Sequence, residues 1–210
     1  MGENTNMTME QGPVTFERPL KKKESRKQKE INSIITWFVR GAAFLAEVLF
    51  VLPLCVVSCS TQPKGDKTVN GFSASFGFKL SYLEEPVVGI WWFVIVFFLT
   101  ALIIILWYAK DMNRLKDLKL RKMMLCFLTG VLAVFNVIII CCFIGVVNAR
   151  VASANEGFAI GEVSVRYTLE FWILLIIQVL LSVGGIFATV KLYCKKYVVH
   201  KSKQKRHGVN

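Results

Sequence analysis

The chain has 210 residues, 54% of them apolar, and its mean hydropathy is +0.51. Its apolar residues gather in long runs instead of recurring with the period of a soluble core, which excludes an ordinary soluble domain and indicates an integral membrane protein. The formal net charge is +12, but the Lys and Arg residues lie in blocks beside the apolar runs, a pattern that favours anionic lipid and argues against nucleic acid as a partner.

The N-terminal part of the chain is polar and basic. Residues 1–33 contain neither Cys nor His, so we expect a disordered cytoplasmic arm without a metal module. Four apolar runs follow, each of which reaches the roughly 20 residues that a helix needs to cross a bilayer. They cover residues 34–57, 89–109, 124–147 and 171–193.

These runs predict the fold class. Because a backbone in hydrocarbon must satisfy its own hydrogen bonds, each run is expected to be a helix. The sequence therefore predicts an all-α membrane protein whose residues 34–193 form a four-helix transmembrane bundle. Residues 194–210 are expected to be a basic cytoplasmic tail.

The end of the first run, Val56-Val57-Ser58-Cys59, has the form of a bacterial lipobox. A leader peptide has a short basic region and an apolar core of about 7 to 15 residues. Here a long arm precedes a longer run, which also carries Arg40 and Glu47. We therefore predict an uncut membrane span, and a lipoprotein acylated at Cys59 is the alternative.

The two outer loops, 58–88 and 148–170, each contain apolar residues that alternate with polar ones, which is the period of a half-buried strand. The alternation runs from Phe72 to Tyr82 in the first loop and from Val163 to Phe171 in the second. A lone strand leaves its edges unsatisfied. We expect the two strands to pair with each other or with neighbouring loop segments in a small extracellular β-sheet.

The distribution of basic residues predicts the orientation. Of the 26 Lys and Arg residues, only five lie in the outer loops, namely Lys64, Lys67, Lys79, Arg150 and Arg166. The positive-inside rule therefore predicts a multi-pass plasma-membrane protein with both termini in the cytoplasm. The arm and the tail are expected to contact the anionic lipids of the inner leaflet.

Three motifs carry a resemblance. They are Leu52-Pro53-Leu54-Cys55-Val56-Val57-Ser58-Cys59, Gly71-Phe72-Ser73-Ala74-Ser75-Phe76-Gly77, and the stretch SVRYTLEFWILLII before the last run. They resemble motifs of a loose group of small, uncharacterised bacterial four-span membrane proteins, and this resemblance implies a bacterial source but no activity. The general plan also resembles the claudin-like architecture, although the claudin loop signature of Trp and paired Cys is absent.

The sequence contains no constellation of catalytic, phosphate-binding or metal-binding residues, so we expect neither an enzyme nor a cofactor. The cysteines leave two interpretations open. Cys55 and Cys59 lie near the same outer end as Cys141 and Cys142, and a disulfide between these ends is one interpretation. The other is that they are small apolar residues.

Polar residues at similar depth in the four runs form the candidate functional site. Its main members are Glu47, Asn136 and Gln178, accompanied by Thr100 and Ser182. An ionisable side chain at that depth costs at least about 2.5 to 3.5 kcal/mol on insertion scales and has to be compensated. Either Glu47 hydrogen-bonds Asn136 or Gln178 and holds helices together, or it is a proton or cation site in a narrow pathway.

Two classes of function are consistent with these features. The first is a non-enzymatic structural or interaction protein, which uses its outer loops and its basic inner face to contact a protein partner, a second copy of the chain, or lipids. The second is a small transporter or channel with a polar site around Glu47. We favour the first class, because the sequence shows no second charge deep in the membrane against which a substrate could be moved.

Overall fold

The computed structural model of the chain describes residues 18–60, 66–79, 87–112, 118–157 and 162–207. The start of the expected arm, the end of the strand predicted up to Tyr82, and the last three residues of the tail lie outside the described residues. Two units are distinguished, Met1–Trp37 and Phe38–Asn210. The described part of the first unit belongs to helix α1 (Arg18–Val51).

Within the described residues, four helical segments are long and apolar enough to cross a membrane, which confirms the prediction of four such helices. The segments are Ser33–Val51, Trp91–Ala109, Lys122–Glu156 and Leu169–Cys194. They belong to α1, to the 3-10 turn η2 (Trp91–Val94) with α3 (Ile95–Met112), to α4 (Leu118–Gly157), and to α5 (Leu169–His207). Four helices of this kind suggest a multi-pass membrane protein.

All four helices extend beyond the predicted spans, α3 only by the three residues up to Met112. Residues 18–33, which we expected to be disordered, belong to α1, and residues 194–207 of the tail continue α5. Both stretches are rich in Lys, Arg and Gln, whose helix propensity is favourable. In addition, α4 passes its predicted end at residue 147 and reaches Gly157.

The predicted first span, 34–57, is wrong at its end. Helix α1 stops at Val51, and strand β1 (Pro53–Cys59) follows. Pro53 has no N–H to donate within a helix, and its ring disfavours helical backbone at the residue before it. The β-branched Val56 and Val57 then favour an extended conformation. The apolar stretch that looked like the end of a membrane helix is therefore a strand.

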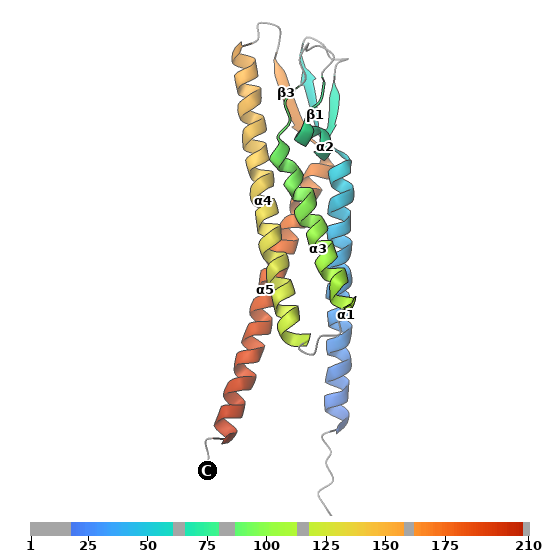
Figure 1. Cartoon of the computed structure of the whole chain (residues 1–210), viewed down its shortest axis with the longest axis vertical. Coiled ribbons are helices and arrows are strands. Elements are labelled where there is room, and N and C mark those ends of the chain that lie inside the picture. The colour runs from blue at the N-terminus through green and yellow to red at the C-terminus, as the bar shows by residue number, and fades with distance from the viewer. Residues whose placement is uncertain (1–17, 61–65, 80–86, 113–117, 158–161, 208–210) are drawn as a thin grey trace, which may run out of the picture. The chain divides into compact units, whose positions relative to one another are not determined.

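Strand β1 is the middle strand of a small antiparallel sheet. In the described part of the chain the order is β2-β1-β3, with β2 at Lys67–Asn70 and β3 at Val163–Tyr167. The sheet lies where α1 ends and α5 begins (Figure 1). The strand predicted in the second outer loop is confirmed over residues 163–167, and its predicted end at 169–171 is the first turn of α5. Its partner is β1 and not the strand predicted in the first outer loop.

The strand predicted from Phe72 to Tyr82 is wrong up to Phe76, because Gly71–Phe76 forms the short helix α2. Beyond this helix, Phe78 forms an isolated antiparallel bridge with Val87. The Asn70 side chain caps this helix by accepting a hydrogen bond from the backbone N–H of Ser73 at 2.8 Å. The helix ends at Gly77, whose φ of 100° favours glycine. Local capping therefore outweighs the alternating pattern.

An aromatic layer joins the sheet end of the molecule to the helices. The ring of Phe50 in α1 stacks on Phe93 of η2 with centroids 5.3 Å apart, and Phe72 of α2 meets Phe50 edge-on at 5.3 Å. Phe93 stacks on Phe143 of α4 at 4.0 Å, and Phe143 lies 6.3 Å from Phe171 of α5. All except Phe72 are fully buried, so this layer contributes strongly to the core.

Helices α4 and α5 approach each other closely at Gly130 and Gly185. A Cβ added to Gly185 would lie 2.7 Å from the backbone nitrogen of Gly130 and 2.8 Å from the carbonyl oxygen of Cys126. The adjacent Gly184 is exposed and would meet nothing within 4 Å. The close approach of the two backbones therefore depends on one glycine of the pair.

We expect Gly185→Ala to lower the free energy of unfolding by about 1 to 3 kcal/mol, since the added methyl group overpacks the contact with α4. The matched variant Gly184→Ala should be neutral or slightly stabilising, because alanine favours helix over glycine. Unfolding in mixed detergent micelles, followed by circular dichroism, measures both. Equal effects of the two substitutions would contradict the packing described here.

Candidate functional site

Three helices each place one buried polar side chain at the same level of the bundle. These are Thr100 of α3, Asn136 of α4 and Gln178 of α5, which are 2%, 0% and 0% exposed. Asn136 Nδ2 donates to Thr100 Oγ1 at 3.0 Å and to Gln178 Oε1 at 3.2 Å. Gln178 Nε2 donates to Thr100 Oγ1 at 3.0 Å. The structure therefore brings together Asn136 and Gln178, which the sequence places at similar depth. The hydroxyl oxygen of Thr100 is the acceptor that both amides share.

Thr100 links this polar cluster to the backbone of its own helix. Its hydroxyl donates to the carbonyl oxygen of Val96 at 2.8 Å and accepts from both amides. Ser182, expected at the same level, donates instead to the carbonyl oxygen of Val179 within α5 at 3.0 Å. It is therefore not part of the interhelical cluster. We define the polar cluster as Thr100, Asn136 and Gln178.

Glu47 does not make the hydrogen bond that we expected with Asn136 or Gln178. Both of its carboxylate oxygens are buried and have no hydrogen-bond partner among the described residues. The same is true of Asn136 Oδ1, although the Nδ2 atom of that amide is bonded twice. The physical reason is that Thr100 and Gln178 use both N–H groups of the Asn136 amide, so this amide has no donor left for Glu47.

Arg40 precedes Glu47 by seven residues on α1 and contacts α3. Its Nη2 donates to the carbonyl oxygen of Trp107 at 2.6 Å, and the guanidinium carbon lies 4.4 Å from the centroid of the Tyr108 ring. The indole N–H of Trp107 donates in turn to Thr129 Oγ1 of α4 at 2.8 Å. The charge of Arg40 is therefore held by a carbonyl oxygen and an aromatic face.

The second candidate region is the face of the sheet that turns away from the buried core. Strand β1 buries Cys55, Val57 and Cys59, while Ser58 lies half-buried on the opposite face. Ser58 is in register with Ser164 of β3, and their hydroxyl oxygens are 2.9 Å apart. This face is polar because alternate residues of each strand point to opposite sides.

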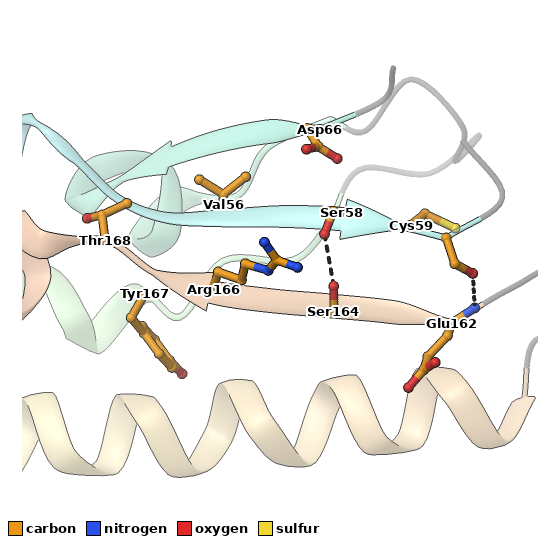
Figure 2. A pocket seen from close by; sticks show the side chains of 10 residues that line it. Val56, Ser58, Cys59, Asp66, Glu162, Ser164, Arg166, Tyr167 and Thr168 are labelled. Atoms are coloured by element: carbon orange, nitrogen blue, oxygen red, sulfur yellow. Dashed lines mark hydrogen bonds between the residues drawn. The ribbon is translucent and has the colours of Figure 1, made fainter. Parts of the chain in front are cut away.

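An open hollow of about 560 Å³ lies on this polar face. Its polar lining includes Ser58, Ser60, Asp66, Glu162, Ser164 and Arg166. Figure 2 shows Arg166 lying along the strands beside Ser58 and Ser164, with Asp66 on the side of β2. The guanidinium of Arg166 has no hydrogen-bond or ion-pair partner among the described residues. It is therefore available to a carboxylate or another acceptor.

Hydrogen bonds hold the rim of the hollow. Ser60 and Glu162 exchange two bonds, in which the Ser60 N–H donates to the Glu162 carbonyl at 3.0 Å and the Glu162 N–H donates to Ser60 Oγ at 2.9 Å. At the other end Thr168 Oγ1 donates to the carbonyl oxygen of Pro53 at 2.7 Å. We use the name outer face for this surface, defined by Ser58, Ser60, Asp66, Glu162, Ser164, Arg166 and Thr168.

Helix α4 covers the free edge of β3. The side-chain amide of Asn155 accepts from the N–H of Val163 at 2.7 Å and donates to its carbonyl oxygen at 3.1 Å. An amide side chain thus replaces a neighbouring strand, which satisfies an edge that would otherwise pair with another chain. The extension of α4 beyond its predicted end is what makes this contact.

Cys55 and Tyr167 face each other across the buried side of the sheet. Burial raises the pKa of the Cys55 thiol to about 11. Burial also raises the pKa of Tyr167 to about 12, and the neighbouring Cys55 adds to this effect. Both groups are therefore neutral at physiological pH, and the Cys55 thiol is a poor nucleophile there.

The six cysteines are thiols and not disulfides, so the disulfide considered between Cys55 or Cys59 and the Cys141-Cys142 pair is not formed. The first two lie on the buried face of β1, whereas Cys141 and Cys142 are exposed on α4. Acylation of Cys59 would follow cleavage before that residue and would remove α1 and all but the last residue of the middle strand. Among the described residues no three His, Cys, Asp or Glu side chains come together as metal ligands.

Comparison with known proteins found no matching family, no matching curated protein and no matching solved structure. The resemblance to a group of bacterial membrane proteins therefore stays a prediction.

We expect Asn136→Leu to lower the free energy of unfolding by about 1 kcal/mol, since it removes two interhelical hydrogen bonds that average roughly 0.6 kcal/mol each in membranes. The control is Ser182→Ala, which removes a bond within one helix and should change the stability by a few tenths of a kcal/mol at most. Unfolding in mixed micelles compares the two. A Ser182→Ala effect as large as that of Asn136→Leu would contradict the interhelical role of the cluster.

We expect Cys55 in the folded protein to react with iodoacetamide at pH 8 about a hundredfold more slowly than in the unfolded chain, because a pKa of about 11 instead of 9.0 lowers the thiolate fraction by that factor. Since the folded pKa is the higher one, this thiol stabilises the fold fully below pH 9 and loses that effect as the pH rises to 11. Peptide mass spectrometry after timed alkylation gives both rates. Equal rates would disprove the burial of this thiol.

Proposed function

We propose that this protein is a multi-pass plasma-membrane protein without enzymatic activity, which binds another protein through the outer face of its sheet. The support comes from the division of the chain into apolar helices and one small polar sheet. Helices that span a membrane leave few polar side chains for recognition, and the sheet carries a hollow lined with charges and hydroxyl groups. Exposed polar loops on a rigid scaffold are where binding residues concentrate.

The proposed orientation places the sheet outside the cell and both termini in the cytoplasm. It is supported by the charge distribution, because most of the 26 Lys and Arg residues lie in the arm, in the segment between α3 and α4, and in the tail. These basic segments would contact anionic lipids of the inner leaflet, at about 1 kcal/mol for each well-placed charge. Lipid contact would orient the protein in the membrane, and the outer face would recognise the protein partner.

The observation that carries the proposal is the environment of Arg166. It lies on a three-stranded sheet with the hydroxyl groups of Ser58 and Ser164 beside it, and these two hydroxyl groups are already bonded to each other. The guanidinium therefore keeps its full set of donors for a group from outside the described residues. A carboxylate side chain of a partner protein, or of a second copy of the chain, fits this arrangement because Arg binds carboxylates with two parallel hydrogen bonds.

The experiment is photo-crosslinking in intact cells with a photoreactive amino acid at one position at a time. Position 164 lies on the outer face, position 165 on the opposite side of the same strand, and position 183 is exposed on the apolar surface of α5. We expect a protein adduct of defined mass from position 164 and none from positions 165 and 183. An adduct of twice the chain's mass identifies a second copy as the partner.

The role of Arg166 is tested by its substitution, with Lys79→Ala as the matched control. Arg166→Ala should abolish most of the adduct from position 164, because the loss of a charged hydrogen-bonding partner costs about 1.5 to 3 kcal/mol. Lys79→Ala removes an exposed positive charge from the same loop region but outside the outer face, and it should leave the adduct unchanged. Adduct formation that does not depend on Arg166, or that is equal at positions 164 and 183, would refute the proposal.

A further inference from the structure

Glu47 lies at the level of the polar cluster. Helices α1 and α3 run antiparallel and are fixed to each other by the rings of Phe50 and Phe97, whose centroids are 5.7 Å apart. Glu47 precedes Phe50 by three residues, and Thr100 follows Phe97 by three. At a rise of 1.5 Å per residue both steps measure about 4.5 Å and lead in the same direction. A contact at the far end, between Arg40 and Trp107, confirms the antiparallel alignment.

Glu47 also points into the bundle. On a helix, residues three apart lie on the same face, so Glu47 shares the face of Phe50 that contacts α3. Both carboxylate oxygens are buried although the residue as a whole is half-buried. A carboxylate that turned towards the lipid would expose its oxygens. It therefore lies on the side of α1 that faces α3.

Two sets of acceptors without a hydrogen-bond partner among the described residues lie at this level. One is the carboxylate of Glu47, and the other is Oδ1 of Asn136, a residue with no exposed surface. None of these three oxygen atoms accepts a hydrogen bond from a described residue. A buried ionised carboxylate without compensation is far too costly in a membrane to persist. The amide oxygen needs only a hydrogen-bond donor, whereas the buried carboxylate needs a positive charge or a proton.

We propose that Glu47 and the polar cluster form a binding site for one monovalent cation, either a proton or an alkali metal ion, inside the bundle. One carboxylate supplies one negative charge, which a monovalent cation neutralises and a divalent cation would exceed. The carboxylate and the amide oxygen of Asn136 are hard oxygen ligands of the kind that such cations prefer. This inference does not depend on the partner proposed for the outer face.

The positive side chains nearest to this level do not compete for the site. Arg40 lies on the same helix, seven residues or about 10 Å from Glu47, and is engaged by the Trp107 carbonyl oxygen and the Tyr108 ring. Lys191 lies on α5, thirteen residues beyond Gln178, or about 20 Å along the helix. Its side chain is exposed near the end of that apolar segment. Neither of these two side chains, the nearest along the described parts of α1 and α5, therefore neutralises Glu47 directly.

The test uses dicyclohexylcarbodiimide on the full-length protein in liposomes. This apolar reagent reacts with protonated carboxyl groups inside membranes: the acid adds across a C=N bond, its proton passes to nitrogen, and the adduct rearranges to a stable N-acylurea. Labelling of the peptide that contains Glu47 is measured by mass spectrometry in choline chloride and in sodium, potassium or lithium chloride. Glu162 and Glu170 in the same protein serve as references outside the site.

Each result has a defined meaning. Labelling of Glu47 that is equal in all salts identifies the proton as the cation, and labelling in choline that an alkali salt suppresses identifies that alkali ion. Absence of labelling in every salt, or labelling no faster than at Glu162, overturns the proposal. Glu47→Gln provides the blank for the labelled peptide.

The involvement of the cluster is tested separately. Asn136→Leu should change the labelling rate of Glu47 by about threefold, the ratio that corresponds to one interhelical hydrogen bond of average strength in a membrane. Thr100→Val is nearly isosteric and removes the hydroxyl shared by both amides, so we expect a similar change in the labelling rate. This variant takes the place of Asn136→Leu if that protein does not fold. Ser182→Ala should leave the rate unchanged. Rates that are unaffected in folded Asn136→Leu or Thr100→Val protein would show that Glu47 and the cluster are not one site.

Discussion

The antiparallel pairing of β1 with β3 is the interaction on which the other elements of the sheet end depend. It joins parts of the chain that are far apart, since Ser58 and Ser164 are separated by 106 residues and lie in register. Only Leu52 separates α1 from β1, and only Thr168 separates β3 from α5. The ladder therefore fixes where these two helices leave the sheet, and the aromatic layer beneath it fills the space that this geometry creates.

The boundary between sheet and helices follows from how each satisfies its backbone hydrogen bonds. A helix satisfies its backbone internally, whereas a sheet of three short strands has two edges that must be hydrated or covered. The change from one to the other occurs at Pro53, which cannot continue the hydrogen-bond pattern of α1. On the far side of the sheet, Asn155 on the extension of α4 covers the edge of β3 at Val163. Helix α4 therefore packs in the apolar bundle and also forms hydrogen bonds with the edge of the polar sheet.

The two polar regions of the protein differ in their physical setting. At the outer face water competes for every donor, so an exposed group such as Arg166 contributes to binding only when a partner displaces that water. Within the bundle no water competes, and an unpaired acceptor such as Asn136 Oδ1 has a large effect on what can occupy the site. Specific recognition of a protein is therefore proposed for the outer face, and the binding of a small cation for the bundle.

The sequence by itself determined the four helices, because their apolar runs are long enough to leave no alternative to a helix in hydrocarbon. It also determined β3, whose alternation is clear, and the depth of Asn136 and Gln178, which follows from counting along a helix. It did not reveal β1, because a buried strand inside an apolar run has no period that distinguishes it from a helix. Pro53 was the one available signal, and the residues of the outer face could have been found only after that strand was recognised.

Only the tertiary structure decided which groups meet. Gly184 and Gly185 are equivalent in the sequence, yet only Gly185 touches α4, because the rotation of α5 about its axis is set by packing. Glu47 and Asn136 lie at one level, but they do not form a hydrogen bond with each other. The Asn136 amide already donates to Thr100 and Gln178, and the sequence could not reveal these bonds. A sequence specifies the length and polarity of each element through local chemistry. Contacts between elements depend on rotations and registers that are fixed only when all the elements pack together.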